Sequence, residues 1–135
     1  MPMQLRIVCP EKSVFEGCVA YVSVPTSEGE FGILPRHASE ICTIGDGYVR
    51  VAIDKMGETD RVFAVADGYV QVANDEVIVL VNHAKDIADV DVEEVAARLQ
   101  GFEDELGNLS ETDARRAYLY NEIAWCKLLL ARQSS

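Results

Sequence analysis

Residues 22–37, VSVPTSEGEFGILPRH, decide how the first part of this chain folds. The stretch opens with an alternation of apolar and polar residues, which is the two-residue period of a β-strand. Pro25 has no N–H for a strand ladder, so the strand is predicted to end there or to lie at an edge. The small polar segment that follows, with Gly29 free to adopt a positive φ, predicts a turn, and Pro35 marks a second stop.

Exposed charge on this loop indicates a binding function. Glu28 and Glu30 lie on the predicted turn, and His37 stands just beyond it. Binding residues are concentrated on loops that a rigid scaffold holds in place, and the prolines of this stretch restrict its backbone. Considered alone, Glu30 would be an ordinary solvated acid and His37 a partly buried histidine. The loop by itself therefore indicates an interaction site without naming the partner.

Residues 1–84 follow a β pattern throughout. Residues 48–53 alternate with a two-residue period that predicts Val49, Val51 and Ile53 inward and Tyr48, Arg50 and Ala52 outward. Residues 59–66 and 69–73 read as two separate strands, because Asp67-Gly68 interrupts the pattern between them. About ten short strands with turn residues at this spacing predict a sandwich or barrel of antiparallel strands.

The pattern changes to helical after residue 85. From Val92 to Leu106 the apolar residues recur at steps of three or four and form one stripe. Asp89 or Asp91 is the candidate N-cap, and Gly107-Asn108 is a typical stop signal. This region therefore predicts one amphipathic helix.

A second helix is predicted from about residue 111 to residue 132, with Ser110 and Asp113 resembling a capping box. A link of two or three residues would force the two helices into an antiparallel hairpin. Residues 117–131 are apolar on nearly every side, and such a helix is buried on more than one face. The first helix alone cannot cover it, so the β domain, another chain or both must contribute.

Together these patterns predict an α+β chain of two domains. An N-terminal antiparallel β-sandwich of about ten strands occupies residues 1–84, and a C-terminal antiparallel α-helical hairpin occupies residues 85–135. Hydrophobic residues make up 49% of the chain, which is ample for a packed core.

Composition excludes several classes of partner. The formal net charge of −11 argues against nucleic acid and against an anionic membrane surface, since both require clustered Lys and Arg. The longest aliphatic run, residues 77–81, is far shorter than the ~20 residues of a membrane-spanning helix, so no direct membrane insertion is predicted. If the protein works at a membrane, a partner holds it there.

The side chains do not form a familiar catalytic or metal-binding pattern. The four cysteines lie far apart without a C-x-x-C pair, and we expect them to be buried free thiols. The chain has only two histidines, and it lacks a G-x-S-x-G motif and a phosphate-binding loop. Cys42, shortly after His37, is the nearest approach to a thiol dyad. We therefore predict no enzyme activity, no cofactor and no metal.

The loop pattern P-T-x-x-G-x-x-G-I-L-P-x-H resembles the signature loop of the epsilon subunit of the F-type ATP synthase. Pro10-Glu11, followed by Phe15 and Gly17, resembles the opening strands of that family. Residues 63–74 resemble its glycine-containing strand turn, and residues 77–84 its last strand. The order of a β domain and then a helical hairpin matches the family from end to end.

The resemblance implies a non-catalytic rotor part of a proton- or sodium-translocating ATP synthase. Members of the family clasp the gamma subunit and rest on the membrane c-ring, peripheral to the cytoplasmic face of the bacterial plasma membrane. The ring presents a polar, partly basic surface, which suits a stiff acidic loop through charge-assisted hydrogen bonds. The partner-binding residues implied here are Glu28, Glu30, Phe31, Gly32 and His37.

The resemblance also implies a regulatory hairpin. In the family it can extend into the catalytic alpha/beta head and block ATP hydrolysis, and some members bind ATP there through an I/L-D-x-x-R-A motif. Asp91 matches this motif, but Glu94 replaces its Arg and Val95 its Ala. An acid in place of a cation repels phosphate, so we predict no tight ATP site.

The alternative is a free-standing β-sandwich binding module that dimerises through its helical hairpin. In that case the apolar second helix would pair with its own copy. A tight homodimer at micromolar concentration would favour this alternative, and a monomer would favour the rotor subunit.

Overall fold

The computed structural model describes residues 3–35, 39–55 and 57–131. The chain divides into two compact units, Met1–Ala88 and Asp89–Ser135. The first unit reaches beyond residue 84 because the last strand continues to Asp86 and is followed by the short 3₁₀ helix η1 (Ile87–Asp89).

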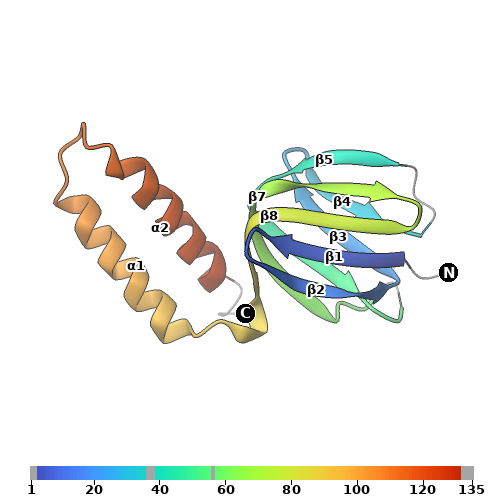
Figure 1. Ribbon diagram of the computed structural model, residues 1–135. Helices are drawn as coiled ribbons and strands as arrows, with labels where there is room; N and C mark the ends of the chain where they lie inside the picture. The colour runs from blue at the N-terminus through green and yellow to red at the C-terminus, as the bar shows by residue number, and fades with distance from the viewer. Residues whose placement is uncertain (1–2, 36–38, 56, 132–135) are drawn as a thin grey trace. The chain divides into compact units, whose positions relative to one another are not determined.

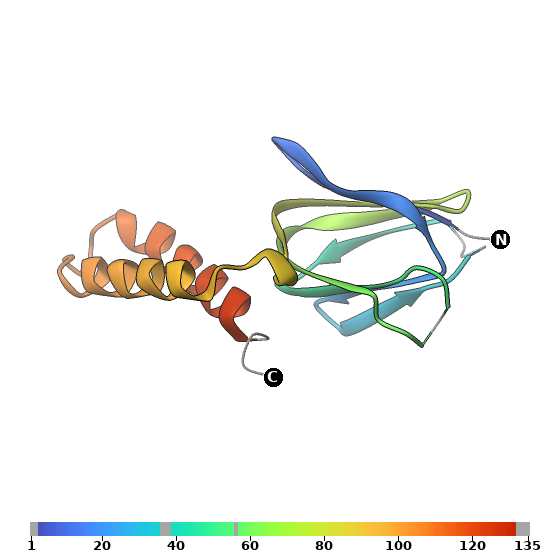
Figure 2. The ribbon, with the colours of Figure 1, turned by 90° about the horizontal axis from the view of Figure 1, so that it is seen from below.

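Eight strands within the described residues build the first unit (Figure 1). They are β1 (Met3–Cys9), β2 (Lys12–Val19), β3 (Tyr21–Thr26), β4 (Gly29–Ile33), β5 (Glu40–Ile44), β6 (Gly47–Ala52), β7 (Arg61–Ala73) and β8 (Glu76–Asp86). Their hydrogen-bonded order is β2-β1-β8-β7-β5-β3-β4, and β6 pairs with β3 and β7. Figure 2, seen from below, shows the strands in two facing layers. The predicted β-sandwich is confirmed, with one pair, β1 and β8, parallel instead of antiparallel.

One long strand replaces two of the predicted short ones. Residues 61–73 form the single strand β7, which bends at Asp67, where φ is 60°. Its first half pairs with β6 and its second half with β5, while β8 pairs with both halves. The prediction of a break at Asp67-Gly68 was wrong because these residues bend the strand without ending it.

Alternating side chains from both layers form the core. Period-2 burial is clearest in β1, where Met3, Leu5 and Ile7 are buried. The largest fully buried side chain of this unit is Phe63, whose ring meets that of Phe15 edge to face at 5.6 Å. Because one face of each strand is buried in this core, the opposite face is the one that can contact other molecules.

The second unit is a helical hairpin of α1 (Val92–Gly107) and α2 (Arg115–Ala131). Asp91 is confirmed as an N-cap, since its carboxylate accepts a 3.1 Å hydrogen bond from the Glu94 N–H. The predicted start of the second helix was wrong. Asp113 accepts the Arg115 N–H at 2.9 Å, so the cap lies beyond Ser110 and the link is longer than expected.

Three contacts hold the helices antiparallel. Arg98 lies 3.9 Å from Glu122, the rings of Phe102 and Tyr118 meet edge to face at 6.5 Å, and Arg115 Nε lies 2.7 Å from Glu105. The buried residues of α2 form one stripe: Leu119, Ile123, Cys126 and Leu129. Tyr118 and Tyr120 are 48% and 53% exposed, so α2 keeps aromatic side chains that another surface can contact.

Candidate interaction site

The predicted acidic loop is a tight hairpin between β3 and β4. Only Ser27 and Glu28 lie between the two strands. The Thr26 hydroxyl donates to the Gly29 carbonyl at 2.6 Å and accepts the Glu28 N–H at 3.2 Å. Gly29 adopts a φ of 113°, a left-handed conformation that favours glycine. The turn is therefore held by its own hydrogen bonds, and we name it the acidic tip (residues 26–32).

Pro25 lies inside β3, so the prediction that the strand ends there or lies at an edge was wrong. On one side it pairs with Glu30 of β4, and its carbonyl accepts the Gly45 N–H at 3.0 Å. β6 pairs with β3 only up to Ser23, and β5 pairs with it at Thr26. The missing N–H of proline falls in the gap between these two partner strands.

The predicted partner-binding residues fall on different faces of the acidic tip. Glu28, Glu30 and Gly32 are exposed. Phe31 is partly buried against the core, on the face of β4 opposite to Glu30. His37 lies outside the described residues, as does any pairing of it with Cys42. The structure therefore brings Glu28, Glu30 and Gly32 to one exposed surface.

Glu30 has an intramolecular partner that the sequence did not reveal. Arg50 Nη1 lies 3.1 Å from one Glu30 carboxylate oxygen and 3.3 Å from the other. The two residues sit on β6 and β4, with β3 between them, in the registers Arg50–Ser23 and Glu30–Pro25. The alternation of residues 48–53 predicts that Arg50 points outward, but only the strand order places it beside Glu30.

Tyr21 and Ser23 complete this face of β3. A Cβ atom at Gly32 would lie 2.3 Å from the Tyr21 hydroxyl oxygen, so the tyrosine occupies the space above the glycine. Ser23 is 6% exposed and lies in register with both Gly32 and Arg50. Ser23 Oγ and Arg50 Nε are buried without a hydrogen-bond partner. Buried polar atoms of this kind are uncommon in proteins.

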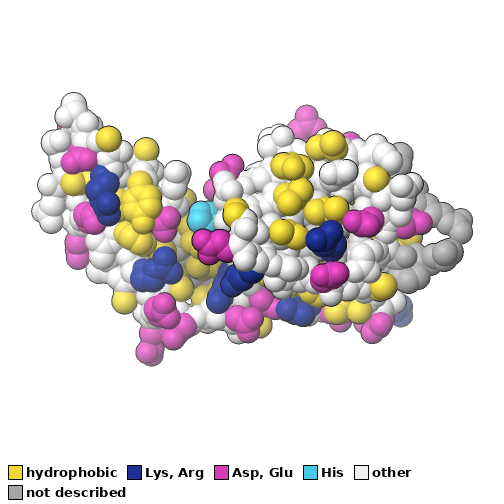
Figure 3. Space-filling model, in the orientation of Figure 1, with side chains coloured by type: hydrophobic (Ala, Val, Ile, Leu, Met, Phe, Trp, Pro, Cys, Tyr) yellow, Lys and Arg dark blue, Asp and Glu magenta, His cyan; other side chains and the backbone are white. Residues whose placement is uncertain are grey.

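A second candidate surface is an apolar face over β5, β7 and β8. Ile41 is 68% exposed and Tyr69 is 45% exposed. The strand registers place Ile78 and Leu80 on the same face, with Val8 beside Leu80. Figure 3 shows the hydrophobic side chains gathered there, with charged side chains around them. An apolar centre with a polar rim is typical of a protein–protein interface.

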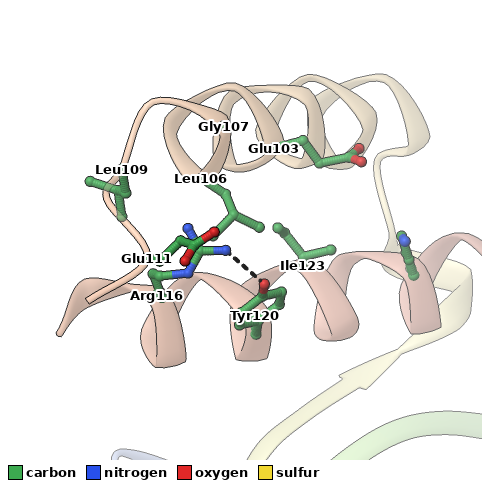
Figure 4. A pocket seen from close by; sticks show the side chains of 9 residues that line it. Glu103, Leu106, Gly107, Leu109, Glu111, Arg116, Tyr120 and Ile123 are labelled. Carbon is green, nitrogen blue, oxygen red and sulfur yellow. Dashed lines mark hydrogen bonds between the residues drawn. The ribbon is translucent and has the colours of Figure 1, made fainter. Parts of the chain in front are cut away.

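A groove of about 500 Å³ lies between the helices near their link (Figure 4). Its floor is apolar, its acidic groups come from α1 and the link, and its basic groups come from α2. The lining residues are Glu103, Leu106, Gly107, Leu109, Glu111, Arg116, Tyr120, Ile123 and Lys127. Arg116 donates a 3.0 Å hydrogen bond to the Tyr120 hydroxyl. The positions of the degenerate ATP motif, including Glu94 and Val95, are not among these lining residues.

The cysteines are free thiols in different environments. Cys126 is buried, Cys9 and Cys42 are half-buried, and Cys18 is exposed. The prediction that all four are buried therefore holds fully for Cys126 alone, and it was wrong for Cys18, which lies on the exposed face of β2. Burial raises the pKa of Cys9, Cys42 and Cys126, and neighbouring Glu40 adds to the raised pKa of Cys42.

Within residues 3–35, 39–55 and 57–131, the acidic, histidine and cysteine side chains do not form a group that could hold a metal ion. In the same part of the chain, neither α1 nor α2 has the length and apolar character needed to cross a membrane.

Comparison with known sequences identifies a family. Residues 2–98 match the beta-sandwich domain of the delta/epsilon chain of ATP synthase. The ATP synthase epsilon chain of Halalkalibacterium halodurans is 37% identical over 119 residues, which cover 87% of each chain. That of Synechococcus elongatus is 33% identical over 113 residues, covering 84% of this chain and 80% of the relative.

Comparison with solved structures supports the same fold. A chain in the Euglena gracilis mitochondrial ATP synthase, a structure of OSCP, F1 and the c-ring, superposes with a TM-score of 0.76 at 19% identity. The match covers 98% of this chain and 81% of the other. A chain of the Tetrahymena thermophila central stalk and c-ring gives a TM-score of 0.61 at 17% identity, covering 100% and 98%.

Proposed function

Because this chain belongs to the delta/epsilon chain family of ATP synthase, as an epsilon chain, we propose that it is a non-catalytic part of the rotor. In this role it couples the membrane c-ring to the gamma subunit and the catalytic head. It would lie at the cytoplasmic face of the bacterial plasma membrane, held there by its partners. The observation that carries the proposal is the acidic tip, a hydrogen-bonded turn with exposed Glu28 and Glu30 on a rigid β scaffold.

The acidic tip is the proposed contact with the c-ring. Torque transfer requires a contact that does not deform. The Thr26 hydroxyl holds the turn by donating to the Gly29 carbonyl and accepting the Glu28 N–H, and Gly29 supplies the left-handed backbone. Its exposed carboxylates can accept hydrogen bonds from a polar partner surface. His37, outside the described residues, remains part of this proposal on the family resemblance.

The apolar face over β5, β7 and β8 is the proposed contact with gamma. Exposed Ile41 and Tyr69 leave a sizeable apolar area in contact with water. Covering such an area is the main favourable term in protein association. The contact with gamma must persist throughout rotation. A large apolar contact meets this requirement better than exposed ion pairs, because salt weakens ion pairs.

The helical hairpin is the proposed contact with the alpha/beta head and the element that restrains ATP hydrolysis. The basic residues Arg115, Arg116 and Lys127 on α2 can meet acidic loops, and Tyr118 and Tyr120 provide exposed aromatic area. Arg115 already pairs with Glu105 within the hairpin, so a contact with the head would compete with that ion pair.

Binding of the full chain to its rotor partners tests the proposal. We expect the purified protein to bind purified gamma and a detergent-solubilised c-ring from the same organism, and to show no ATP hydrolysis alone. Ile41→Asp should weaken binding to gamma by at least about tenfold, since it places a charge in the apolar contact. The matched control is Val92→Asp, because Val92 is an exposed apolar residue of α1, at 44%.

Glu28→Gln should weaken binding to the c-ring, and Glu11→Gln, in the exposed turn after β1, serves as its control. Absence of binding to gamma and to the ring, under conditions where both partners are folded, would reject the rotor assignment. A tight homodimer in sedimentation, with no binding to gamma, would support the free-standing module instead.

A further inference from the structure

The charge of Glu30 is not free to act on a partner. Arg50 Nη1 lies within hydrogen-bonding distance of both carboxylate oxygens, at 3.1 and 3.3 Å. Arg50 Nε is buried, while the side chain as a whole is 41% exposed. The pair is therefore a defined feature of the acidic tip and carries no net charge.

This neutralisation changes which partner group the acidic tip can attract. A partner cation near Glu30 would also lie near the Arg50 guanidinium, so repulsion offsets most of the attraction. An uncharged donor meets no such opposition, and the carboxylate keeps lone pairs that Arg50 does not use. Glu28, at the turn itself, is the acid of the tip that remains to attract positive charge.

The pair also places a donor beside an acceptor. The guanidinium has five N–H groups on three nitrogens, and the contacts with Glu30 are made by the nitrogen Nη1. The side chains of Arg50 and Glu30 are 41% and 50% exposed, so both are accessible to a partner. An amide, whether a side-chain carboxamide or a peptide group, offers the matching acceptor and donor together.

We propose that Arg50 determines the specificity of the acidic tip: by pairing with Glu30 it makes this surface select an uncharged, amide-bearing partner segment over a cationic one. This inference rests on the proposed function, in which the partner is the c-ring. It assigns a role to a residue that the loop pattern does not contain. Ser23, whose Oγ is also buried, lies in register between Arg50 of β6 and Gly32 of β4, the strand that carries Glu30.

Whether Arg50→Gln weakens or strengthens binding to the c-ring distinguishes an uncharged partner segment from a cationic one. Affinity of the full-length protein for a detergent-solubilised c-ring is measured at 50 and 500 mM KCl for the natural chain, Arg50→Gln, Arg50→Lys and Glu30→Gln. We expect Arg50→Gln and Glu30→Gln each to weaken binding about tenfold at both salt concentrations, because a charge-assisted hydrogen bond is lost. Arg50→Lys keeps the ion pair and should stay within about threefold of the natural chain.

Arg6→Gln is the matched control, because Arg6 also has a buried, unpaired Nε but lies on β1. It should not change ring binding. Thermal unfolding of each variant checks that it is folded. If Arg50→Gln is unfolded, the ring affinities of Arg50→Lys and Glu30→Gln still test the inference.

Tighter ring binding by Arg50→Gln at 50 mM that disappears at 500 mM would overturn the inference, because it is the behaviour of a cationic partner. Binding by Arg50→Gln and Glu30→Gln equal to that of the natural chain would overturn it as well. Failure of the natural chain to bind the ring would instead reject the proposed function.

Discussion

The Asn82 side-chain amide donates a 2.7 Å hydrogen bond to the Asp67 carboxylate, across the bend of the β7–β8 hairpin. Asp67 adopts a left-handed φ of 60°, which is unfavourable for a residue with a side chain. The hydrogen bond offsets part of this cost and fixes the bend. β7 pairs with β6 before the bend and with β5 after it. The Asn82–Asp67 hydrogen bond therefore lies where β7 passes from one partner strand to the other.

Replacing Gly68 by Ala should destabilise the β unit severely. A Cβ atom at this position would lie 1.9 Å from the Leu80 carbonyl oxygen, a backbone atom that cannot move aside without disturbing β8. We expect the free energy of unfolding to fall by at least about 3 kcal/mol in urea denaturation. Gly45→Ala is the control, because its nearest neighbour would be at 3.9 Å and should change stability by less than about 1 kcal/mol. Equal effects of the two changes would contradict this account of the bend.

Replacing Leu119 by Ala should unfold the helical hairpin selectively. Leu119 is fully buried in the stripe of α2, so its loss leaves a cavity that costs about 2–5 kcal/mol. The measurement is thermal loss of the helical circular dichroism signal. Asn121→Ala, at an exposed position of the same helix, should change the midpoint little. Persistence of the hairpin in Leu119→Ala with an unchanged midpoint would show that the two helices do not depend on this contact.

The thiols should react at different rates with an alkylating reagent. Burial raises the pKa of Cys126 and Cys9, which lowers the fraction of reactive thiolate at any pH below that pKa. Exposed Cys18 should therefore react at least about tenfold faster than buried Cys126 at pH 8, as read by mass spectrometry of peptides. The rate at Cys126 should rise further as pH increases. In urea all four should react alike, and a native Cys126 as fast as Cys18 would refute its burial.

Replacing Asp86 by Ala should release the segment that follows β8. The Asp86 carboxylate accepts the Arg61 Nε–H at 2.8 Å and the Ala88 N–H at 2.9 Å, and it is largely buried. Arg61 also lies over the rings of Phe15 and Phe63. The loss of a part-buried ion pair and a backbone cap should cost about 2 kcal/mol.

Hydrogen exchange measures this effect directly, because the Ala88 amide should exchange faster in Asp86→Ala. Exposed Asp89→Ala is the control and should leave the Ala88 amide protected. Protection that survives the loss of Asp86 would mean that another contact holds this segment.

Much of the fold follows from local pattern. The two-residue period of residues 48–53 and the helical stripe from Val92 to Leu106 fixed the type of each element, because alternation and 3.6-residue repeats place apolar side chains on one face. Asp91 was identifiable as a cap because its type and place before the stripe are those of a residue that accepts helix N–H groups. Glu28 and Glu30 were identifiable as exposed acids because they lie in a short polar segment with Gly29, which is typical of a turn.

What the sequence could not provide is which strands lie side by side. Glu30 and Arg50 meet because their strands, β4 and β6, both pair with β3. Likewise β1 pairs in parallel with β8, the last strand of the β unit in sequence. Asp67 bends β7 instead of ending it because β8 follows the bend and Asn82 closes it. Periodicity in the chain set the faces of strands and helices, since it depends only on neighbours in sequence. Strand order and the ion pair of the acidic tip came from the tertiary structure, since they depend on how distant segments share one core.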